Sequence, residues 1–204
     1  MTGFDFQRSL LDGIDPTTWR DRVQQLMADA ERRRPMARYN TGTISEAACL
    51  YLLALTNRIR PKTVIEVGTF IGTSSTVMSL FADRIYTCDK SNDCFPGTAR
   101  IVCHPFTGSK RMLTGLRGRL VEADLFFFDG RISDDEIPSI RALSHATTVY
   151  AFDDFEGEEK GVINVKKLMP QLALGSHVLI TPPTSVYGLD SKTTIALLVP
   201  GDWL

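Results

Sequence analysis

The sequence predicts an α/β protein: a doubly wound, mostly parallel sheet of seven strands, with an antiparallel last strand and helices ahead of the sheet. Short apolar runs alternate with stretches long enough for helices, which is typical of a parallel sheet covered on both faces. The last two runs are separated only by turn-forming residues. At about 150 residues per domain, the length predicts one domain over 1–204, with a peripheral N-terminal helical arm (1–38) and an α/β core (39–204).

The charge balance limits the partners that this chain can have. Its 204 residues include 23 Lys and Arg against 24 Asp and Glu, for a net charge of −1. Proteins that hold nucleic acid by its phosphates carry a basic excess, so no nucleic-acid partner is expected. No apolar run reaches the roughly 20 residues that cross a bilayer, and no basic segment followed by an apolar one opens the chain. We therefore expect no membrane partner and no secretion signal.

The cysteines favour a cytoplasmic location. Cys49, Cys88, Cys94 and Cys103 show no CxxC spacing and are too few for a disulfide scaffold. We expect four thiols that serve as small buried side chains in a reducing compartment.

Two helices are predicted ahead of the sheet. Thr17 or Thr18 is expected to cap the first, which ends in the basic run Arg32–Arg34 before Pro35. The second covers about 44–57, and its nearly continuous apolar residues predict burial on most sides. The N-terminal arm is also a candidate interface for a homodimer.

The predicted strands follow in order along the chain. They cover Thr63–Val67, Arg84–Cys88, Ala99–Cys103, Leu125–Phe128, Val149–Phe152, His177–Ile180 and Thr194–Val199. The first five are separated by stretches that can hold helices, so they are expected to be parallel. The segment TPPTSVYGLDSK between the last two is rich in turn formers, so this pair is expected to be antiparallel, at or near a sheet edge.

A glycine turn follows the first strand, where ligands of doubly wound sheets bind. Gly68 and Gly72 stand four residues apart in EVGTFIG (66–72), which allows a tight strand-to-helix turn, and Thr73 can cap the helix that follows. The segment is neither GxGxxG nor a P-loop. Glu66 would repel a pyrophosphate and would suit a ligand with an ammonium group. The alternative is a structural turn with a solvent-facing Glu66.

Two further strand ends supply candidate ligand contacts. Asp89 ends the second strand about 20 residues after the glycine turn, where a carboxylate can accept two hydrogen bonds from a ribose diol. Gly108 and Ser109 follow the third strand and could contact an adenine edge. A plain turn and helix cap explains that pair equally well.

Carboxylates follow the fourth and fifth strands. Asp129 ends one, and Asp153 and Asp154 end the other, so three like charges are predicted to converge. Such charges must be relieved by protons, cations or a metal, and oxygen ligands suit Mg²⁺, Ca²⁺ or Mn²⁺. The alternative is that only one of the adjacent aspartates reaches the site, with Arg131 or Lys160 neutralising it.

Together these residues resemble the class I S-adenosylmethionine (SAM)-dependent methyltransferases, above all the small catechol-type O-methyltransferases and related bacterial groups. Residues 66–72 match the family's first motif, an acid followed by Gly-x-x-x-Gly. Tyr39-Asn40-Thr41-Gly42 looks like the loop that closes over the cofactor. The aspartates fall where those enzymes carry an Asp and an Asp-Asn pair around magnesium. The resemblance covers roughly 39–199 and implies a Rossmann-like fold.

The resemblance also implies roles for single residues. Glu66 would help to hold the amino end of SAM, Asp89 the ribose hydroxyls, and Gly108 with Ser109 the adenine. The implied cofactor-binding set is Thr41, Glu66, Gly68, Thr69, Phe70, Gly72, Thr73, Asp89, Gly108, Ser109 and Asp129, and the implied metal ligands are Asp129, Asp153 and Asp154.

The chain departs from the family's pattern near the metal ligands. Asp154 stands where the usual residue is Asn, and the Lys that serves as general base shortly after the first metal Asp is missing. Arg131 is the nearest cation in sequence, and an Arg does not deprotonate at neutral pH. The candidate catalytic residues are therefore Asp129, Asp154 and Arg131, with one of the aspartates as a direct base if no metal binds.

The main hypothesis is SAM-dependent methyl transfer to a small-molecule acceptor at oxygen, with Mg²⁺ as an optional second cofactor. The missing Lys favours an alternative, a catalytically silent binding protein that keeps the cofactor pocket. A nucleotide-dependent oxidoreductase is a third hypothesis, and Glu66 at the first glycine position speaks against it.

Overall fold

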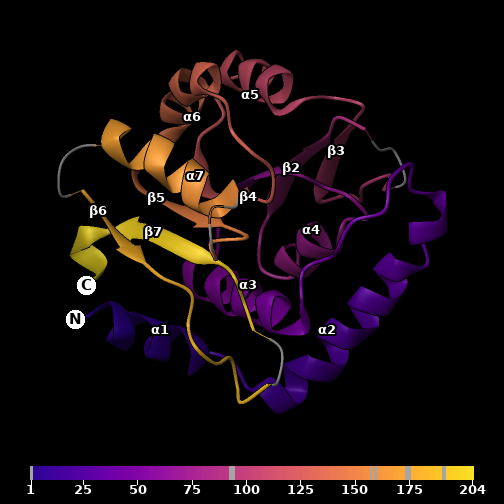
Figure 1. Cartoon of the computed structure of the whole chain (residues 1–204), viewed down its shortest axis with the longest axis vertical. Coiled ribbons are helices and arrows are strands. Elements are labelled where there is room, and N and C mark those ends of the chain that lie inside the picture. The colour runs from indigo at the N-terminus through magenta and orange to yellow at the C-terminus, as the bar shows by residue number, and fades with distance from the viewer. Residues whose placement is uncertain (1, 92–94, 157, 159, 173–175, 190–191) are drawn as a thin grey trace.

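The computed structural model describes residues 2–91, 95–156, 158, 160–172, 176–189 and 192–204. They form one seven-stranded sheet in the order β3-β2-β1-β4-β5-β7-β6 (Figure 1). The strands are β1 Thr63–Val67, β2 Arg84–Asp89, β3 Ile101–Pro105, β4 Ala123–Phe128, β5 Ser144–Phe152, β6 His177–Ile180 and β7 Ala196–Pro200. The first five pair in parallel, and β7 is antiparallel to β5 and to the edge strand β6. The predicted fold class is confirmed.

Helices cover both faces of the sheet, as the alternation of apolar runs predicted. One core cluster contains residues of α1 (Gly3–Leu11), α2 (Pro16–Glu31), α3 (Glu46–Ile59) and α4 (Thr73–Met78). The other contains residues of α5 (Ser109–Arg117), α6 (Ile137–Ala142) and α7 (Lys160–Leu168). In Figure 1 the second group lies above the sheet and the first below it. Four short 3₁₀ turns complete the described elements, at Arg34–Met36, Asp134–Glu136, Met169–Gln171 and Gly201–Trp203.

The helices of the N-terminal arm differ in detail from the prediction. Asp15, not Thr17 or Thr18, caps α2, because its carboxylate accepts the backbone N–H groups of both threonines at 3.1 and 3.3 Å. Pro16 then occupies the first helical position, where its fixed φ fits and no N–H is needed. The helix α3 confirms the predicted burial on most sides, since all ten residues from Ala47 to Thr56 are buried.

The bounds of β2, β3, β4, β5 and β7 differ from those predicted, and the starts of β3 and β5 show the physical reasons. A tight turn with reciprocal hydrogen bonds between Thr98 and Ile101 delays β3 by two residues, and Gly97 supplies the left-handed φ of 81°. The strand β5 begins at Ser144, five residues before the predicted start. Its first four residues are not buried, and only the following five are, so polar residues extend the strand ahead of its buried part. Periodicity alone gave no apolar signal for that first half.

An aromatic ladder stiffens the two strands that carry the acidic residues. Phe126 and Phe128 of β4 stack at 5.6 Å, and they stack on Tyr150 and Phe152 of β5 at 5.6 and 5.4 Å. All four side chains are at most 1% exposed. Each such pair contributes about 0.5–1.5 kcal/mol beyond the burial of its area. The strand ends that follow the ladder are therefore held by a rigid support.

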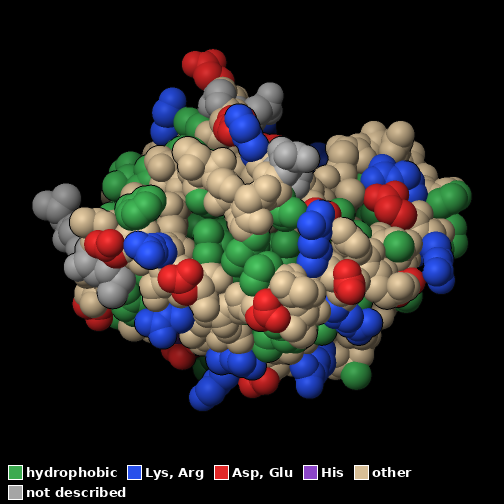
Figure 2. All heavy atoms as spheres, turned by 90° about the horizontal axis from the view of Figure 1, so that it is seen from below, with side chains coloured by type: hydrophobic (Ala, Val, Ile, Leu, Met, Phe, Trp, Pro, Cys, Tyr) green, Lys and Arg blue, Asp and Glu red, His purple; other side chains and the backbone are tan. Residues whose placement is uncertain are grey.

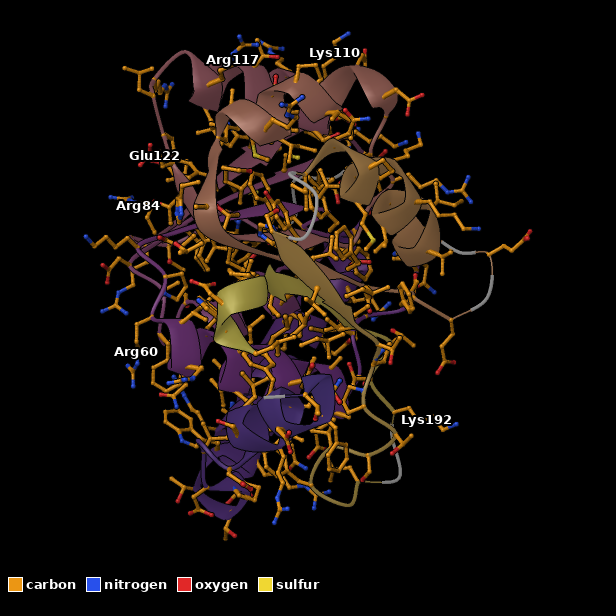
Figure 3. All side chains as sticks on the ribbon, turned by 90° about the vertical axis from the view of Figure 1, so that its left-hand side faces the viewer. Arg60, Arg84, Lys110, Arg117, Glu122 and Lys192 are labelled. Atoms are coloured by element: carbon orange, nitrogen blue, oxygen red, sulfur yellow. The ribbon has the colours of Figure 1, made fainter. Side chains whose placement is uncertain are left out.

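Charged side chains of both signs cover the outside of the molecule. Figure 3 shows Arg60, Arg84, Lys110, Arg117, Glu122 and Lys192 pointing away from it, and all six are exposed. Figure 2, which views the molecule from below, shows acidic and basic groups interspersed around a central group of hydrophobic ones. No described helix is long and apolar enough to cross a bilayer. Cys49 and Cys88 are buried, as predicted, whereas Cys103 is only half-buried because β3 is the edge strand, and Cys94 lies outside the described residues.

The start of α7 packs directly on the segment that follows β5. A Cβ at Gly161 would lie 2.2 Å from the backbone oxygen of Asp153, so only glycine allows this approach. One turn later, the buried Asn164 accepts from the Ile132 N–H and donates to the Gly130 carbonyl, both at 2.9 Å. The helix is thereby attached to the ends of β4 and β5.

This contact gives a stability prediction. Gly161→Ala should lower the free energy of unfolding by about 2 kcal/mol or more, because the new methyl group must displace backbone. The matched control is Gly115→Ala in α5, where a Cβ meets nothing within 4 Å; it should raise the free energy by about 0.5–1 kcal/mol. Urea denaturation measures both. A Gly161→Ala protein as stable as the wild type would show that α7 can move off β5 without cost.

Candidate active site

A cleft of about 480 Å³ opens at the carboxyl ends of β1, β2 and β4, beside the start of α5. Gly68, Asp89, Gly108, Ser109 and Asp129 line it, so five of the predicted cofactor-binding residues share one cavity. This is the edge at which doubly wound sheets bind their ligands. Tyr39 and Arg131 also line the cleft.

The glycine turn after β1 adopts backbone that other residues avoid. Gly68 has φ 101°, and a Cβ there would come 3.2 Å from the backbone of Asp129. Gly72 has φ 77°, and its Cβ would lie 2.6 Å from the ring of Phe95. A hydrogen bond of 2.8 Å from the Gly72 N–H to the Thr69 carbonyl closes the turn. Both positions therefore require glycine. A side chain at Gly68 would meet the backbone of Asp129 at the end of β4, and one at Gly72 would meet the Phe95 ring.

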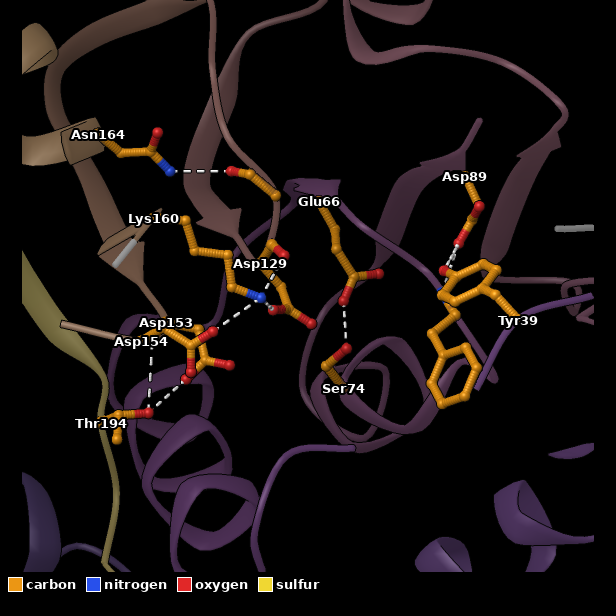
Figure 4. Close-up of polar contacts among 12 residues, drawn as sticks. Tyr39, Glu66, Ser74, Asp89, Asp129, Asp153, Asp154, Lys160, Asn164 and Thr194 are labelled. Atoms are coloured by element: carbon orange, nitrogen blue, oxygen red, sulfur yellow. Dashed lines mark hydrogen bonds and ion pairs between the residues drawn. The ribbon is translucent and has the colours of Figure 1, made fainter. Parts of the chain in front are cut away.

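Asp89 is held at the cleft by three donors. One carboxylate oxygen accepts the Tyr39 hydroxyl at 2.6 Å (Figure 4) and the Phe70 N–H at 3.0 Å. The other accepts the Ser91 N–H at 2.8 Å. The Tyr39 ring packs on that of Phe70 at 5.2 Å. The Tyr39 contact was not predicted, because 50 residues separate it from Asp89 and only the loop, not its hydroxyl, was recognised.

Glu66 does not face the cleft. It is fully buried and accepts hydrogen bonds from the hydroxyls of Ser74 and Ser75 at the start of α4. Burial raises its pKa, and the two serines oppose this rise. The expectation of a Glu66 that faces solvent or a ligand's ammonium group is corrected here: its carboxylate is used to join β1 to α4.

Other predicted cofactor-binding residues lie outside the cleft and make hydrogen bonds around it. The Thr69 hydroxyl pairs with that of Thr87 at 2.6 Å, and Thr73 pairs with Thr43 at 3.0 Å. Thr41 is exposed, and its carbonyl accepts from Arg34 at 2.7 Å. Together with Glu66, Phe70 and Gly72, these residues do not line the cavity; they shape the turn and the loop around it.

Arg34 holds the segment that crosses the glycine turn. Its guanidinium contacts Glu31 of α2, the Asn40 side chain at 2.8 Å and the Thr41 carbonyl, and it lies 5.1 Å from the centre of the Phe70 ring. The arm and the cleft are thus joined by one side chain. The basic run at the end of α2, which predicted only a helix end, contains this residue.

Three carboxylates converge beside the cleft, as predicted. One oxygen from each of Asp129, Asp153 and Asp154 lies within 4.8 Å of the others. Asp154 takes a left-handed φ of 52°, which Asp tolerates better than most residues. The chain turns at this residue, so the side chains of both Asp153 and Asp154 reach the site. Asp153 is 6% exposed and accepts from the Thr194 hydroxyl at 2.8 Å. The alternative in which only one of the pair arrives is not what the structure shows.

Lys160, not Arg131, is the cation of this cluster. Its ammonium donates to a carboxylate oxygen of Asp129, to the Asp129 carbonyl at 2.8 Å and to Asp154 at 2.9 Å (Figure 4). Arg131 is exposed on the rim of the cleft and has no ion pair with these acids in the structure as described. The sequence analysis left Arg131 and Lys160 open as the neutralising cation, and the structure selects Lys160, although it lies 31 residues from Asp129 and Arg131 only two.

Burial and close charges shift the pKa values of the cluster. Burial raises the pKa of Asp129, with Asp153 adding to the rise and Lys160 opposing it. Burial also raises the pKa of Asp153, against the hydrogen bond from Thr194. Burial lowers the pKa of Lys160, but Asp129 and Asp154 outweigh it and the pKa is raised. Lys160 is therefore a permanent ammonium at neutral pH.

Comparison with known proteins identifies the fold. No protein-family model and no curated sequence matches this chain. Among solved structures, it is similar to the O-methyltransferase TomG from Streptomyces achromogenes, involved in tomaymycin synthesis and in complex with SAM, at 18% identity and a TM-score of 0.60, covering 86% of this chain and 88% of that one. It is also similar to the O-methyltransferase from Bacillus cereus in complex with SAH, at 12% identity and a TM-score of 0.60, covering 87% and 90%.

The buried Glu66 gives a pH prediction. Because its pKa is raised in the folded state, the folded protein keeps a proton that the unfolded chain has lost, and stability falls as pH rises from about 4.5 through the folded pKa. Glu66→Gln has no such proton to lose. The variant should therefore gain stability relative to the wild type over this range, by about 1.4 kcal/mol for each unit of the shift.

Urea unfolding of both proteins at several pH values measures the difference, in which all other titrating groups cancel. The control is Glu122→Gln, an exposed carboxylate at the start of β4, which should follow the wild-type curve. Parallel curves for Glu66→Gln and the wild type would contradict the prediction.

Proposed function

We propose that this protein transfers the methyl group of SAM to an oxygen of a small-molecule acceptor. The observation that carries the proposal is that the glycine turn, Asp89, the uncapped start of α5 and the acidic cluster all meet at one sheet edge. The two structural neighbours described above share this fold and hold SAM or SAH in their own complexes. The identity is low, so the site chemistry, not the likeness, supports the assignment.

The described residues fit SAM. Gly68 lets the chain pass close to a ligand, and the Asp89 oxygen that accepts only the Ser91 N–H has capacity left for a ribose hydroxyl. Gly108 caps α5 without a side-chain hydrogen bond, so backbone N–H groups at the helix start are open to acceptor atoms of a base. SAM would supply a methyl group already activated on a sulfonium, so the protein's main task is alignment.

Asp154 is the proposed proton acceptor. Its side chain is 42% exposed, against 23% for Asp129, and Asp153 is turned toward Thr194. The Asp154 carboxylate would accept the proton of the acceptor hydroxyl when that oxygen takes the methyl group that SAM would supply, with SAH as the leaving group. Arg131, on the rim of the same cleft, is proposed to position the acceptor.

The acidic cluster has no free set of ligands for a divalent cation in the part of the chain described. Three carboxylates would suit Mg²⁺ by their chemistry. However, the Lys160 ammonium already bonds to oxygens of Asp129 and Asp154, and Asp153 accepts from Thr194. The residues as placed therefore do not fit a second cation, and no step is assigned to a metal.

The cofactor site can be tested by calorimetric titration with SAM and SAH. Binding to the wild type is expected, and Asp89→Asn should weaken it by about tenfold or more, because a charged acceptor of hydrogen bonds is lost. The control is Asp83→Asn, an exposed aspartate at the opposite end of β2. It should bind as the wild type does.

The outcomes separate the hypotheses. If neither ligand gives heat or raises the melting temperature, the proposal fails. If SAM binds but no methyl reaches any of a panel of phenols and other hydroxyl compounds, the catalytically silent binding protein is favoured instead.

A further inference from the structure

The acidic cluster carries a cation of its own, supplied by the chain. Three carboxylates within 4.8 Å of one another require compensation by protons, a metal or a positive side chain. An ammonium has three N–H donors and no acceptor. Lys160 directs its donors to three acceptors, a carboxylate oxygen of Asp129, the carbonyl of Asp129 and a carboxylate oxygen of Asp154. Its hydrogen-bonding capacity is therefore used within the cluster.

Lys160 is held in this place by the helix that it begins. The next residue, Gly161, donates its N–H to the Asp154 carbonyl at 3.2 Å and lies against the backbone of Asp153. Asn164, one turn on, bonds to Gly130 and Ile132 in the loop after β4. The face of α7 that carries Lys160 is thus attached to both strand ends that supply the acids. The backbone of Lys160 is therefore placed beside both acids, within reach of its ammonium.

We propose that the Lys160 ammonium takes the place of a divalent metal ion in this site, so that the protein's reaction needs no metal. A metal would use the same oxygens of Asp129 and Asp154, and a second cation there would be repelled by the first. The inference rests on the proposed function only in taking methyl transfer as the reaction of this site. Lys160 is a positioning residue: it fixes Asp129 and Asp154 and offsets their charge.

The test is a Mn²⁺ titration of the full chain without SAM, followed by the paramagnetic resonance signal of free Mn²⁺. Wild-type protein dialysed against a chelator should leave the signal unchanged at submillimolar Mn²⁺. Lys160→Met removes the charge and keeps a flexible apolar side chain, so it should bind one Mn²⁺ per chain, about tenfold or more tighter than the wild type. The matched control is Lys166→Met, an exposed position on the same helix, which should behave as the wild type.

Removal of Lys160 leaves three acids uncompensated, and this variant can fail to fold. The double variant Lys160→Met/Asp154→Asn removes one of the negative charges and keeps an oxygen ligand at that position. It should also bind Mn²⁺ more tightly than the wild type. The proposal is overturned if the wild type binds one Mn²⁺ that Asp129→Asn abolishes, or if the folded variants bind Mn²⁺ no better than the wild type.

A second readout uses catalysis once an acceptor is known. Methyl transfer by the wild type should be unchanged by chelators, and an activity that chelators abolish and Mg²⁺ restores would contradict the proposal. Failure here differs from failure of the proposed function, because SAM binding and Mn²⁺ binding are measured separately. A protein that binds SAM and also requires Mg²⁺ would keep the function and lose this inference.

Discussion

The parallel pairing of β1 with β2 on one side and β4 on the other is the constraint on which the site depends. The pairing continues one residue past the strands, since the Gly68 N–H bonds to the Cys88 carbonyl at 3.2 Å and the Asp129 N–H to the Val67 carbonyl at 2.9 Å. These bonds place the glycine turn, the end of β2 and the end of β4 at one level. Gly68 has to be glycine because the backbone of Asp129 lies beside it. The position of the cleft is therefore determined by the register of the backbone in the sheet, and the side chains only line it.

The acidic groups at this sheet edge are compensated in two ways. Glu66 lies inside the sheet and is satisfied by two serine hydroxyls, so it needs no counter-charge. Asp129 and Asp154 share an ammonium instead. These side chains are half-buried, so loss of the ammonium would leave both carboxylates partly desolvated and without compensation. The aromatic ladder below and α7 beside the cluster keep the partners in place, so stability and chemistry depend on the same contacts.

Much of the candidate site could be predicted from the order of residues along the chain. The bounds predicted for β1 and β6 agree with the structure, and Asp89, Asp129, Asp153 and Asp154 were placed at strand ends by the apolar runs before them. Predictions failed where the deciding contact was distant in sequence or polar. Glu66 was assigned to the ligand because its partners lie eight and nine residues ahead, in a helix whose rotation a sequence does not reveal.

The order of residues was enough to identify the fold class, the sheet edge at which ligands would bind and the residue types present there, because strand ends of a parallel sheet meet at one edge. Tertiary structure alone decided which carboxylates face the cleft, that Tyr39 reaches Asp89, and that Lys160 neutralises the acids while Arg131 stays at the rim. The physical reason is that hydrogen bonds and charges act over a few ångströms in space. Which groups come that close depends on how α7 and the N-terminal arm pack, and that packing joins residues 31 and 50 positions apart.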